Sequence, residues 1–263
     1  GPQAYEARAL GQTQGIPAGY YKGLEKLSGQ RLLKELQKVA RRGHKDLGYD
    51  RARDIMFETI EDPDGDDRLD TIYTGFVIEG VNDRKTAYKQ HVSTEHVWPQ
   101  SMGAKGVAKN DMHHLYPSEV GANSTRNNLP LGDVSRVERE LPNFGEGAPS
   151  KIGYASAIGF AGARMVFEPR DSRKGDLARA MLYFYTRYGA HSGRGRSDVV
   201  LTNFELEHDA LVRWHVEDPV TPEEKVRNQA IFKAQGNRNP FVDHPEYVQK
   251  IGRFLPGKGE PTN

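Results

Sequence analysis

The sequence predicts a single mixed α+β domain that is rich in helix, and three observations predict this fold class. Several segments carry apolar residues at helical spacing or begin with strong helix-start signals. Shorter segments rich in β-branched and aromatic residues lie between them. No internal repeat and no long linker marks a domain boundary within the 263 residues. We expect a flexible arm over residues 1–19, one domain over 20–255 and a tail over 256–263.

The first helices are expected near the N-terminus. Gln30–Arg42 carries apolar residues at helical spacing, with Ser28 as a plausible N-cap and Gly43 as the stop. A second helix should begin near Asp50 and continue to about Ile60.

Strands are expected between these helices and the middle of the chain. Leu69–Ile78 is rich in β-branched and aromatic residues and predicts a strand. Thr86–Val92 is a weaker strand candidate. Residues 133–174 give mixed signals, so we expect most of them to be loop.

The C-terminal third predicts helices. Leu177–Tyr188 is apolar almost all round, which is typical of a buried helix, and Gly189 should end it. Residues 193–196 are expected to form a flexible basic loop that contacts phosphate or simply lies at the surface. Thr221, followed by Pro and two Glu, is a strong helix start, and that helix should run to about Gly236.

The composition limits the classes of function. Thirty-seven Lys and Arg nearly cancel 36 Asp and Glu, so a nucleic acid would have to be bound by a local basic surface. The lack of cysteine excludes disulfides, thiolate nucleophiles and cysteine-based metal sites. No apolar run approaches the ~18 residues of a membrane span. Aromatic content of 9% is enough to anchor a folded interior, in which we place Trp98 and Trp214.

The densest chemistry lies in one stretch of the sequence. Glu95, His96 and Asn123 offer a carboxylate, an imidazole and an amide oxygen, which together could hold one divalent cation and activate one water. Because Glu95 and His96 are adjacent, a regular strand would point them to opposite faces. The chain must therefore bend or twist there, and Pro99 fits a strand that breaks. His113–Pro117 and the following residues predict a short strand and a short helix that could return Asn123 to the first strand.

Several ordered motifs in this stretch carry a resemblance to a known family. They are Glu95–Pro99, Asp111–Pro117 and Val120–Asn128, with Tyr20–Leu24, Tyr73–Gly75, Trp214-His215, Asp218–Val220 and Gln235–Glu246 outside it. Over about residues 20–250 the sequence resembles the endonuclease I family of bacterial periplasmic and secreted nucleases. The resemblance implies a ββα-metal (His-Me) finger over about residues 86–128.

The resemblance also implies roles at matching positions. His96 falls where the family places its general base, and Glu95 and Asn123 fall where it places metal ligands, with Mg²⁺ expected and Mn²⁺ or Ca²⁺ as alternatives. His114, with His113, is expected to brace the finger by hydrogen bonds.

The activity implied is metal-dependent, nonspecific endonuclease cleavage of DNA, RNA or both, leaving 5′-phosphate ends. Arg126 and Arg238 are our candidates to clamp the phosphate. We expect a monomer bound to the nucleic-acid backbone, with no membrane association. The resemblance implies a secreted or periplasmic protein, and because Gly1-Pro2 is typical of a cleaved tag, we expect that its signal peptide has been removed.

Alternatives remain open at this stage. The chain could be a catalytically silent nucleic-acid-binding protein or a phosphodiesterase of small nucleotides. His113 and His114 could form a zinc cluster with His96, although no His-Glu-x-x-His spacing exists. Glu61–Asp67 resembles a calcium loop, but its Gly is misplaced, so a solvated acidic turn is expected. Asn237–Pro240 is expected to tie down a loop.

Overall fold

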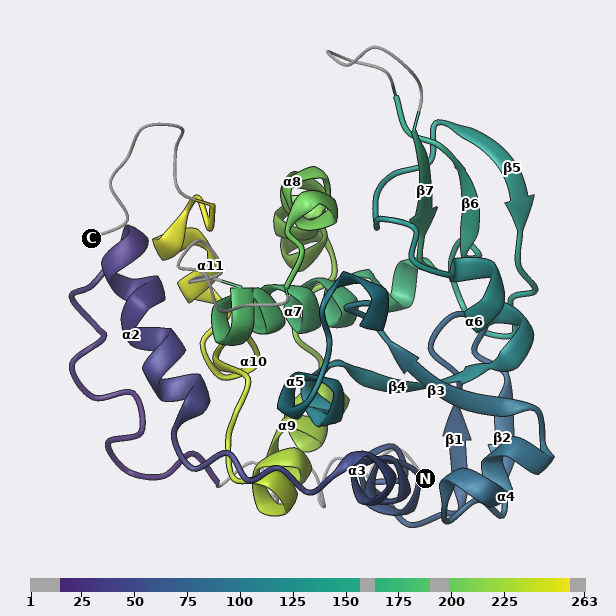
Figure 1. Cartoon of the computed structure of the whole chain (residues 1–263), viewed down its shortest axis with the longest axis horizontal. Helices are drawn as coiled ribbons and strands as arrows, with labels where there is room; N and C mark the ends of the chain where they lie inside the picture. The colour runs from purple at the N-terminus through teal and green to yellow at the C-terminus, as the bar shows by residue number, and fades with distance from the viewer. Residues whose placement is uncertain (1–14, 157–163, 190–198, 256–263) are drawn as a thin grey trace.

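The computed structural model describes residues 15–156, 164–189 and 199–255. Most of the described helices lie on one side of the molecule, and the small antiparallel sheets lie on the other with α4 and α6 (Figure 1). The predicted class, a helix-rich α+β domain, is confirmed. Among the described residues, no helix combines the length and the apolar character that crossing a membrane would require. The basic loop predicted at 193–196 lies outside the described residues.

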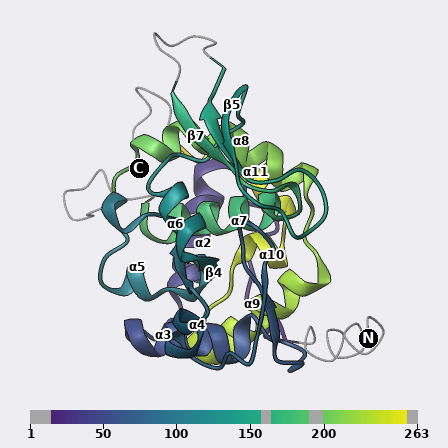
Figure 2. The same cartoon turned by 90° about the vertical axis from the view of Figure 1, so that its right-hand side faces the viewer.

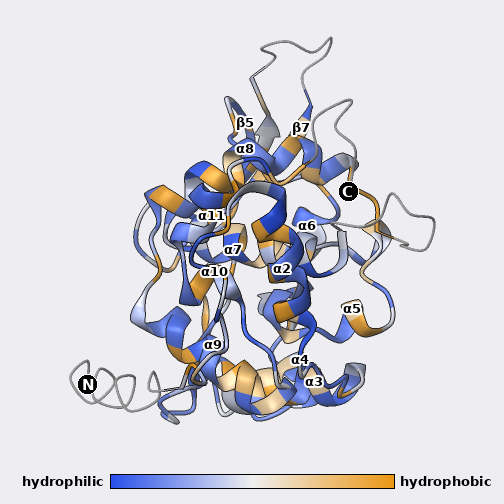
Figure 3. Cartoon of the chain, turned by 90° about the vertical axis from the view of Figure 1, so that its left-hand side faces the viewer, coloured by the Kyte–Doolittle hydropathy of each residue, from blue (hydrophilic) through white to orange (hydrophobic). Residues whose placement is uncertain are grey.

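A buried helix organises the helical side. α7 (Lys174–Phe184) is buried from Gly175 to its end and continues as a π-helical turn through Gly189, as its nearly all-apolar sequence predicts. α8 (Thr202–Glu217) packs along it, and α2 (Gly29–Arg41) packs against its final turn. Apolar and polar residues alternate around α2 in Figure 3, and its apolar residues face the core.

The remaining helices are shorter, apart from α9. They are α3 (Tyr49–Ile55) with the π-helical turn η1 (Met56–Ile60), α4 (Arg84–Lys89), α5 (Val107–Asn110), α6 (Val120–Arg126), α9 (Pro222–Gln235), α10 (Pro240–Asp243), α11 (Glu246–Ile251) and the 3₁₀ turns η2 (Gln100–Met102), η3 (Met112–His114) and η4 (Asp171–Arg173). α9 begins and ends as predicted: the Thr221 hydroxyl accepts from the Glu224 N–H at 3.2 Å, and Gly236 is left-handed.

The strand predicted over Leu69–Ile78 is wrong. The segment is a hairpin of two short antiparallel strands, β1 (Arg68–Asp70) and β2 (Val77–Glu79). The chain turns between them because the Thr71 and Thr74 hydroxyls bond each other at 3.1 Å and Gly75 takes a left-handed φ of 72°.

The weak strand predicted over Thr86–Val92 is also wrong, because most of it is helix α4. Asp83 forms a capping box with Thr86: the Asp83 carboxylate accepts from the Thr86 N–H at 2.7 Å, and the Thr86 hydroxyl accepts from the Asp83 N–H. The first four backbone N–H groups of any helix have no partner within the helix, which destabilises its start. The capping box gives one of these groups a partner in the Asp83 carboxylate.

Residues 133–174 contain a sheet where we predicted loop. β5 (Arg136–Glu140), β6 (Lys151–Tyr154) and β7 (Met165–Glu168) form an antiparallel sheet in that order. All five residues of β5 are exposed, so this strand shows no alternation of buried and exposed residues. Pairing with β6 defines it instead.

The pair β3–β4 positions the functional stretch. β3 (Val92–His96) pairs antiparallel with β4 (Leu115–Glu119), and α6 follows at once, giving the expected strand–strand–helix order. Figures 1 and 2 place α6 above this pair and α4 below it. The pair contributes buried residues to two apolar clusters, Val92 to one and Tyr116 to the other, so it is held on both faces.

The larger cluster includes the residues that directly follow β3. Trp98, two residues after β3, is 1% exposed and stacks on Phe184 of α7 with ring centroids 4.7 Å apart. Trp214 is fully buried in the same cluster. The prediction that both tryptophans belong to the core is confirmed.

Candidate active site

A cavity of about 410 Å³ opens where α6 faces the end of β3. Glu95, His96 and Asn123, separated along the chain, all line it. The other lining residues are Tyr88, Ser93, Thr94, Pro99, Gln100, Ser101, Val120, Ser124, Asn127 and Asn128. Both neighbours at the end of β3 reach one cavity because the strand ends at His96. The candidate base, His96, and the candidate metal ligands, Glu95 and Asn123, therefore line the same cavity.

Glu95 presents a buried carboxylate to this cavity. It is 2% exposed, and its Oε1 oxygen accepts from the Tyr73 hydroxyl at 2.7 Å and from Arg126 Nη1 at 2.8 Å. Burial raises the pKa of Glu95, while Arg126 and Tyr73 act in the opposite direction. Both side-chain hydrogen bonds fall on one oxygen, Oε1, so no side chain of a described residue donates to Oε2; a hydrogen bond from the His96 backbone to the carboxylate also lowers the pKa of Glu95.

Arg126 is not placed to clamp a phosphate. It is fully buried, and besides Glu95 it donates to the backbone carbonyl oxygens of His96 at 3.2 Å and Val97 at 2.9 Å. Its guanidinium therefore holds the end of β3 and orients Glu95 from behind. The expectation that it faces the substrate is corrected.

Arg238 is not placed to clamp a phosphate either, so this expectation is also corrected. It is 3% exposed, its Nε donates to Asp243 at 2.6 Å, and it also bonds Gln229. It ties the loop after α9 to α10, which agrees with the structural part expected for Asn237–Pro240. That expectation fits the other polar residues too, because Asn237 and Asn239 are buried and hydrogen bonded.

His96 is held in one tautomer by its surroundings. Its Nε2 lies 3.2 Å from the carbonyl oxygen of Lys109, which can only accept, so Nε2 carries the proton and Nδ1 the lone pair. The side-chain nitrogen of Gln100 lies 3.4 Å from that Nδ1. Burial lowers the pKa of His96 well below its usual value, and His114 adds to the effect. The imidazole is thus neutral near neutral pH.

Asn123 returns to β3 as the sequence suggested. Its Nδ2 donates to the Ser93 hydroxyl at 3.2 Å and to the Thr94 carbonyl at 3.3 Å. Because the strand holds the amide nitrogen, the oxygen Oδ1 remains for a ligand within the cavity that Asn123 lines.

His113 and His114 lie behind the site in the turn before β4. Both are buried, and their Nε2 atoms donate to backbone carbonyls, of Asn237 at 3.1 Å and of Ala108 at 2.8 Å respectively. Burial lowers the pKa of each to about 4. In the described part of the chain the three histidines form no metal-ligand cluster.

Two cations near His96 were missed by the sequence reasoning. Arg53 of α3 and Lys109 of α5 lie over the ring of Tyr49, at 3.8 and 3.9 Å from its centroid. That ring lies 5.6 Å from the ring of His96. The electrostatic influence of both cations lowers the pKa of His96 further. No local motif links these residues; only the packing of α3 and α5 brings them together.

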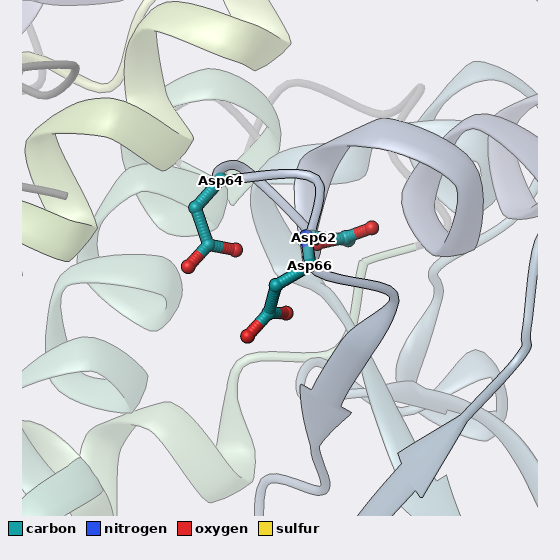
Figure 4. Close-up of side chains that lie close together, drawn as sticks. All are labelled: Asp62, Asp64 and Asp66. Carbon is teal, nitrogen blue, oxygen red and sulfur yellow. Dashed lines mark hydrogen bonds between the residues drawn. The ribbon is translucent and has the colours of Figure 1, made fainter. Parts of the chain in front are cut away.

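The acidic turn lies elsewhere, between η1 and β1. Ligand atoms of Asp62, Asp64 and Asp66 come within 4.8 Å of one another, and Figure 4 shows the three side chains. Asp62 accepts from the backbone N–H groups of Asp66 at 3.1 Å and Asp67 at 3.3 Å. The Asp62 carboxylate therefore stabilises the turn by hydrogen bonds to its backbone.

Comparison with known proteins shows the family of this chain. A family model described as Endonuclease I matches residues 29–246. The chain is 32% identical over 247 residues to the extracellular ribonuclease of Bacillus subtilis, covering 88% of this chain and 77% of that protein. It is 28% identical over 133 residues to an extracellular deoxyribonuclease of Aeromonas hydrophila, covering 51% and 48%. The resemblance inferred from the motifs is confirmed: the chain is a nuclease, a hydrolase acting as an endonuclease, and it belongs to the endonuclease I family.

Proposed function

We propose that this endonuclease hydrolyses phosphodiester bonds of DNA and RNA, with His96 as general base and one divalent cation held by Glu95 and Asn123. The observation that carries the proposal is the meeting, in one cavity, of a neutral imidazole with two oxygens, Oε2 of Glu95 and Oδ1 of Asn123, to which no side chain of a described residue donates.

The donor set fits a hard cation. Oε2 of Glu95 and Oδ1 of Asn123 are oxygens, which Mg²⁺ prefers, and an open cavity allows it to keep several waters. Mn²⁺ or Ca²⁺ would accept the same ligands. When bound, such a cation supplies positive charge where the phosphate and the departing oxygen gain negative charge.

His96 would take a proton from the attacking water at Nδ1. The Lys109 carbonyl holds the ring by its other nitrogen, so Nδ1 keeps its lone pair, and the attacking water would replace the Gln100 amide nitrogen that lies 3.4 Å from it. Water then adds to phosphorus, the bond to the 3′ oxygen breaks, and that oxygen takes a proton from solvent, leaving a 3′ hydroxyl and a 5′ phosphate. Arg53 and Lys109 replace Arg126 and Arg238 as our candidates to meet the phosphate.

The relatives guide the proposal on substrate and location. One is named for RNA and another for DNA, so we assign both substrates to this chain. Both are named extracellular, and we propose a secreted or periplasmic protein that acts as a monomer.

The test is a nicking assay on plasmid DNA and an RNA of matched length, with Mg²⁺ or with chelator. Wild-type protein should cleave both only with the cation. His96→Ala should lose roughly 100- to 10,000-fold in turnover while retaining nucleic-acid binding. Near-wild-type cleavage by this variant would reject the base assignment. Cleavage of only one of the two polymers would reject the assignment of both substrates, and cleavage that persists with chelator would reject the cation.

A further inference from the structure

An exposed aromatic side chain stands at the edge of the active-site cavity. Tyr88 of α4 is 66% exposed, the highest value among the exposed large apolar side chains that the structure describes. It lines the active-site cavity and also a second hollow of about 420 Å³. Ser93 and Thr94 are shared in the same way. The ring therefore lies at the boundary between the two hollows.

The second hollow is basic. Arg53, Arg84, Lys85 and Lys89 line it. Arg84 is paired with Asp50 and Asp54, whereas Lys85 and Lys89 are exposed and form no ion pair with any residue within the described ranges. Lys85 lies three residues before Tyr88, and Lys89 lies one residue after it. All three side chains are therefore on the part of α4 that borders this hollow.

We propose that Tyr88 is a stacking platform for a nucleobase next to the scissile phosphate, and that Lys85 and Lys89 bind phosphates of the same strand in the second hollow. This inference rests on the proposed function, because it places the cleaved bond beside His96. A strand leaving the active-site cavity toward α4 must pass the Tyr88 ring, and an exposed ring face accepts any base.

The occupant is a single strand. A base within a duplex is already stacked on both faces, so it cannot lie on Tyr88 without leaving its neighbours. A single strand exposes its bases at no such cost. Ring and lysines together give the combination of stacking and backbone charge that binds single strands without reading their sequence.

The test measures binding, so that it does not depend on cleavage. The dissociation constant of a fluorescently labelled single-stranded DNA is measured by anisotropy with chelator present, for the wild type, Tyr88→Ala and Tyr88→Phe. Loss of one base stack should weaken binding by Tyr88→Ala roughly 5- to 150-fold. Tyr88→Phe keeps the ring and should stay near the wild type. The effect on a duplex of the same sequence should be much smaller.

The lysines are tested by salt dependence. In the double variant that combines Lys85→Ala and Lys89→Ala, the logarithm of the affinity should depend less steeply on the logarithm of the salt concentration. The magnitude of this slope should fall by about 0.7 for each phosphate that the protein no longer neutralises. The matched control is Lys26→Ala with Lys34→Ala, exposed lysines at or near α2, at the opposite side of the molecule from α4 (Figure 1). It should leave the slope unchanged.

The outcomes separate this inference from the proposed function. Equal binding by Tyr88→Ala and wild type, or no binding of single strands at all, would overturn the stacking role. Tight binding that depends on Tyr88, without cleavage in Mg²⁺, would support the platform and reject the proposed catalysis.

Discussion

The carboxylate of Glu95 is held by a single cation, and that cation is itself buried. Arg126 lies beneath the cavity and bonds Glu95 and two backbone carbonyls at the end of β3. Taking both charges out of water is costly, and each is tolerated because the other is present. The arrangement keeps Oε1 of Glu95 fixed in a residue that lines the cavity.

Removing Arg126 should therefore cost far more than removing a surface arginine. Arg126→Leu leaves a buried carboxylate without its counter-charge and takes one donor from each of two backbone carbonyls, and we expect a loss of about 3–5 kcal/mol in the free energy of unfolding. Arg51→Leu, which breaks an exposed pair with Glu58, should change it by at most about 1 kcal/mol. Urea unfolding of both variants measures the difference. Similar small losses for the two would contradict the role assigned to Arg126.

Sequence reasoning identified Glu95, His96 and Asn123 because their residue types lie in one short, patterned stretch. It could not identify the surroundings. Arginine is usually exposed, so the sequence offers no reason to place Arg126 under the site. The Lys109 carbonyl that holds His96 is a backbone atom, which carries no residue-specific signal.

At the scale of elements, helix α4 depends on the residue that precedes it. The helix has six residues, too few to be stable alone, and it carries Tyr88 to the cavity. Asp83 satisfies donors at its start, where the side chain accepts from the Thr86 N–H at 2.7 Å. This cap favours a helix in a segment that we predicted as a strand.

Asp83→Ala should destabilise the protein by about 1 kcal/mol, the usual cost of a lost N-cap. Ser28→Ala provides a matched control, because Ser28 occupies the N-cap of α2 but makes no side-chain capping bond. That variant should stay close to the wild type. Thermal unfolding of both variants decides the matter, and equal shifts in Tm would show that the Asp83 bond adds no stability.

The elements that sequence predicted well are those whose signals are local. The apolar face of α2, the buried α7 and the Thr221 cap of α9 each lie within one short window. β5 is different, because its five exposed residues become a strand only by pairing with β6. Such pairing joins segments that no short window contains.

At the scale of the molecule, buried polar residues join the site to the helical side. Asp111, just before η3, accepts from the hydroxyls of Tyr183 at 2.7 Å and Tyr188 at 2.8 Å, and from Gln235 at 2.7 Å. These donors come from α7, its π turn and α9. The turn that carries His113 and His114 is thereby fixed to the body of the protein.

Glu207 makes a second connection of this kind, from α8 to the segment after α6. It is fully buried, and its Oε1 accepts from the Leu131 N–H at 2.7 Å. Its Oε2 has no hydrogen-bond partner within the described part of the chain. Burial raises the pKa of Glu207 from 4.5 to about 7, against the lowering effects of the Leu131 bond and of Arg126.

This raised pKa predicts how stability depends on pH. Between pH 4.5 and about 7 the native state keeps a proton on Glu207 that the unfolded state has lost. Native protein then binds more protons than unfolded protein, so the free energy of unfolding falls as pH rises through this window and levels off above it. At about 1.4 kcal/mol per pKa unit, Glu207 accounts for a loss of roughly 3 kcal/mol.

Glu207→Gln isolates this contribution. The amide oxygen can still accept from the Leu131 N–H, but the side chain no longer titrates. Other groups titrate equally in both proteins, so the stability of the wild type relative to Glu207→Gln should decrease steadily between pH 4.5 and about 7, and hold constant outside that range. Chemical unfolding at a series of pH values gives the two curves. Parallel curves would mean that burial does not raise the pKa of Glu207 in the folded protein.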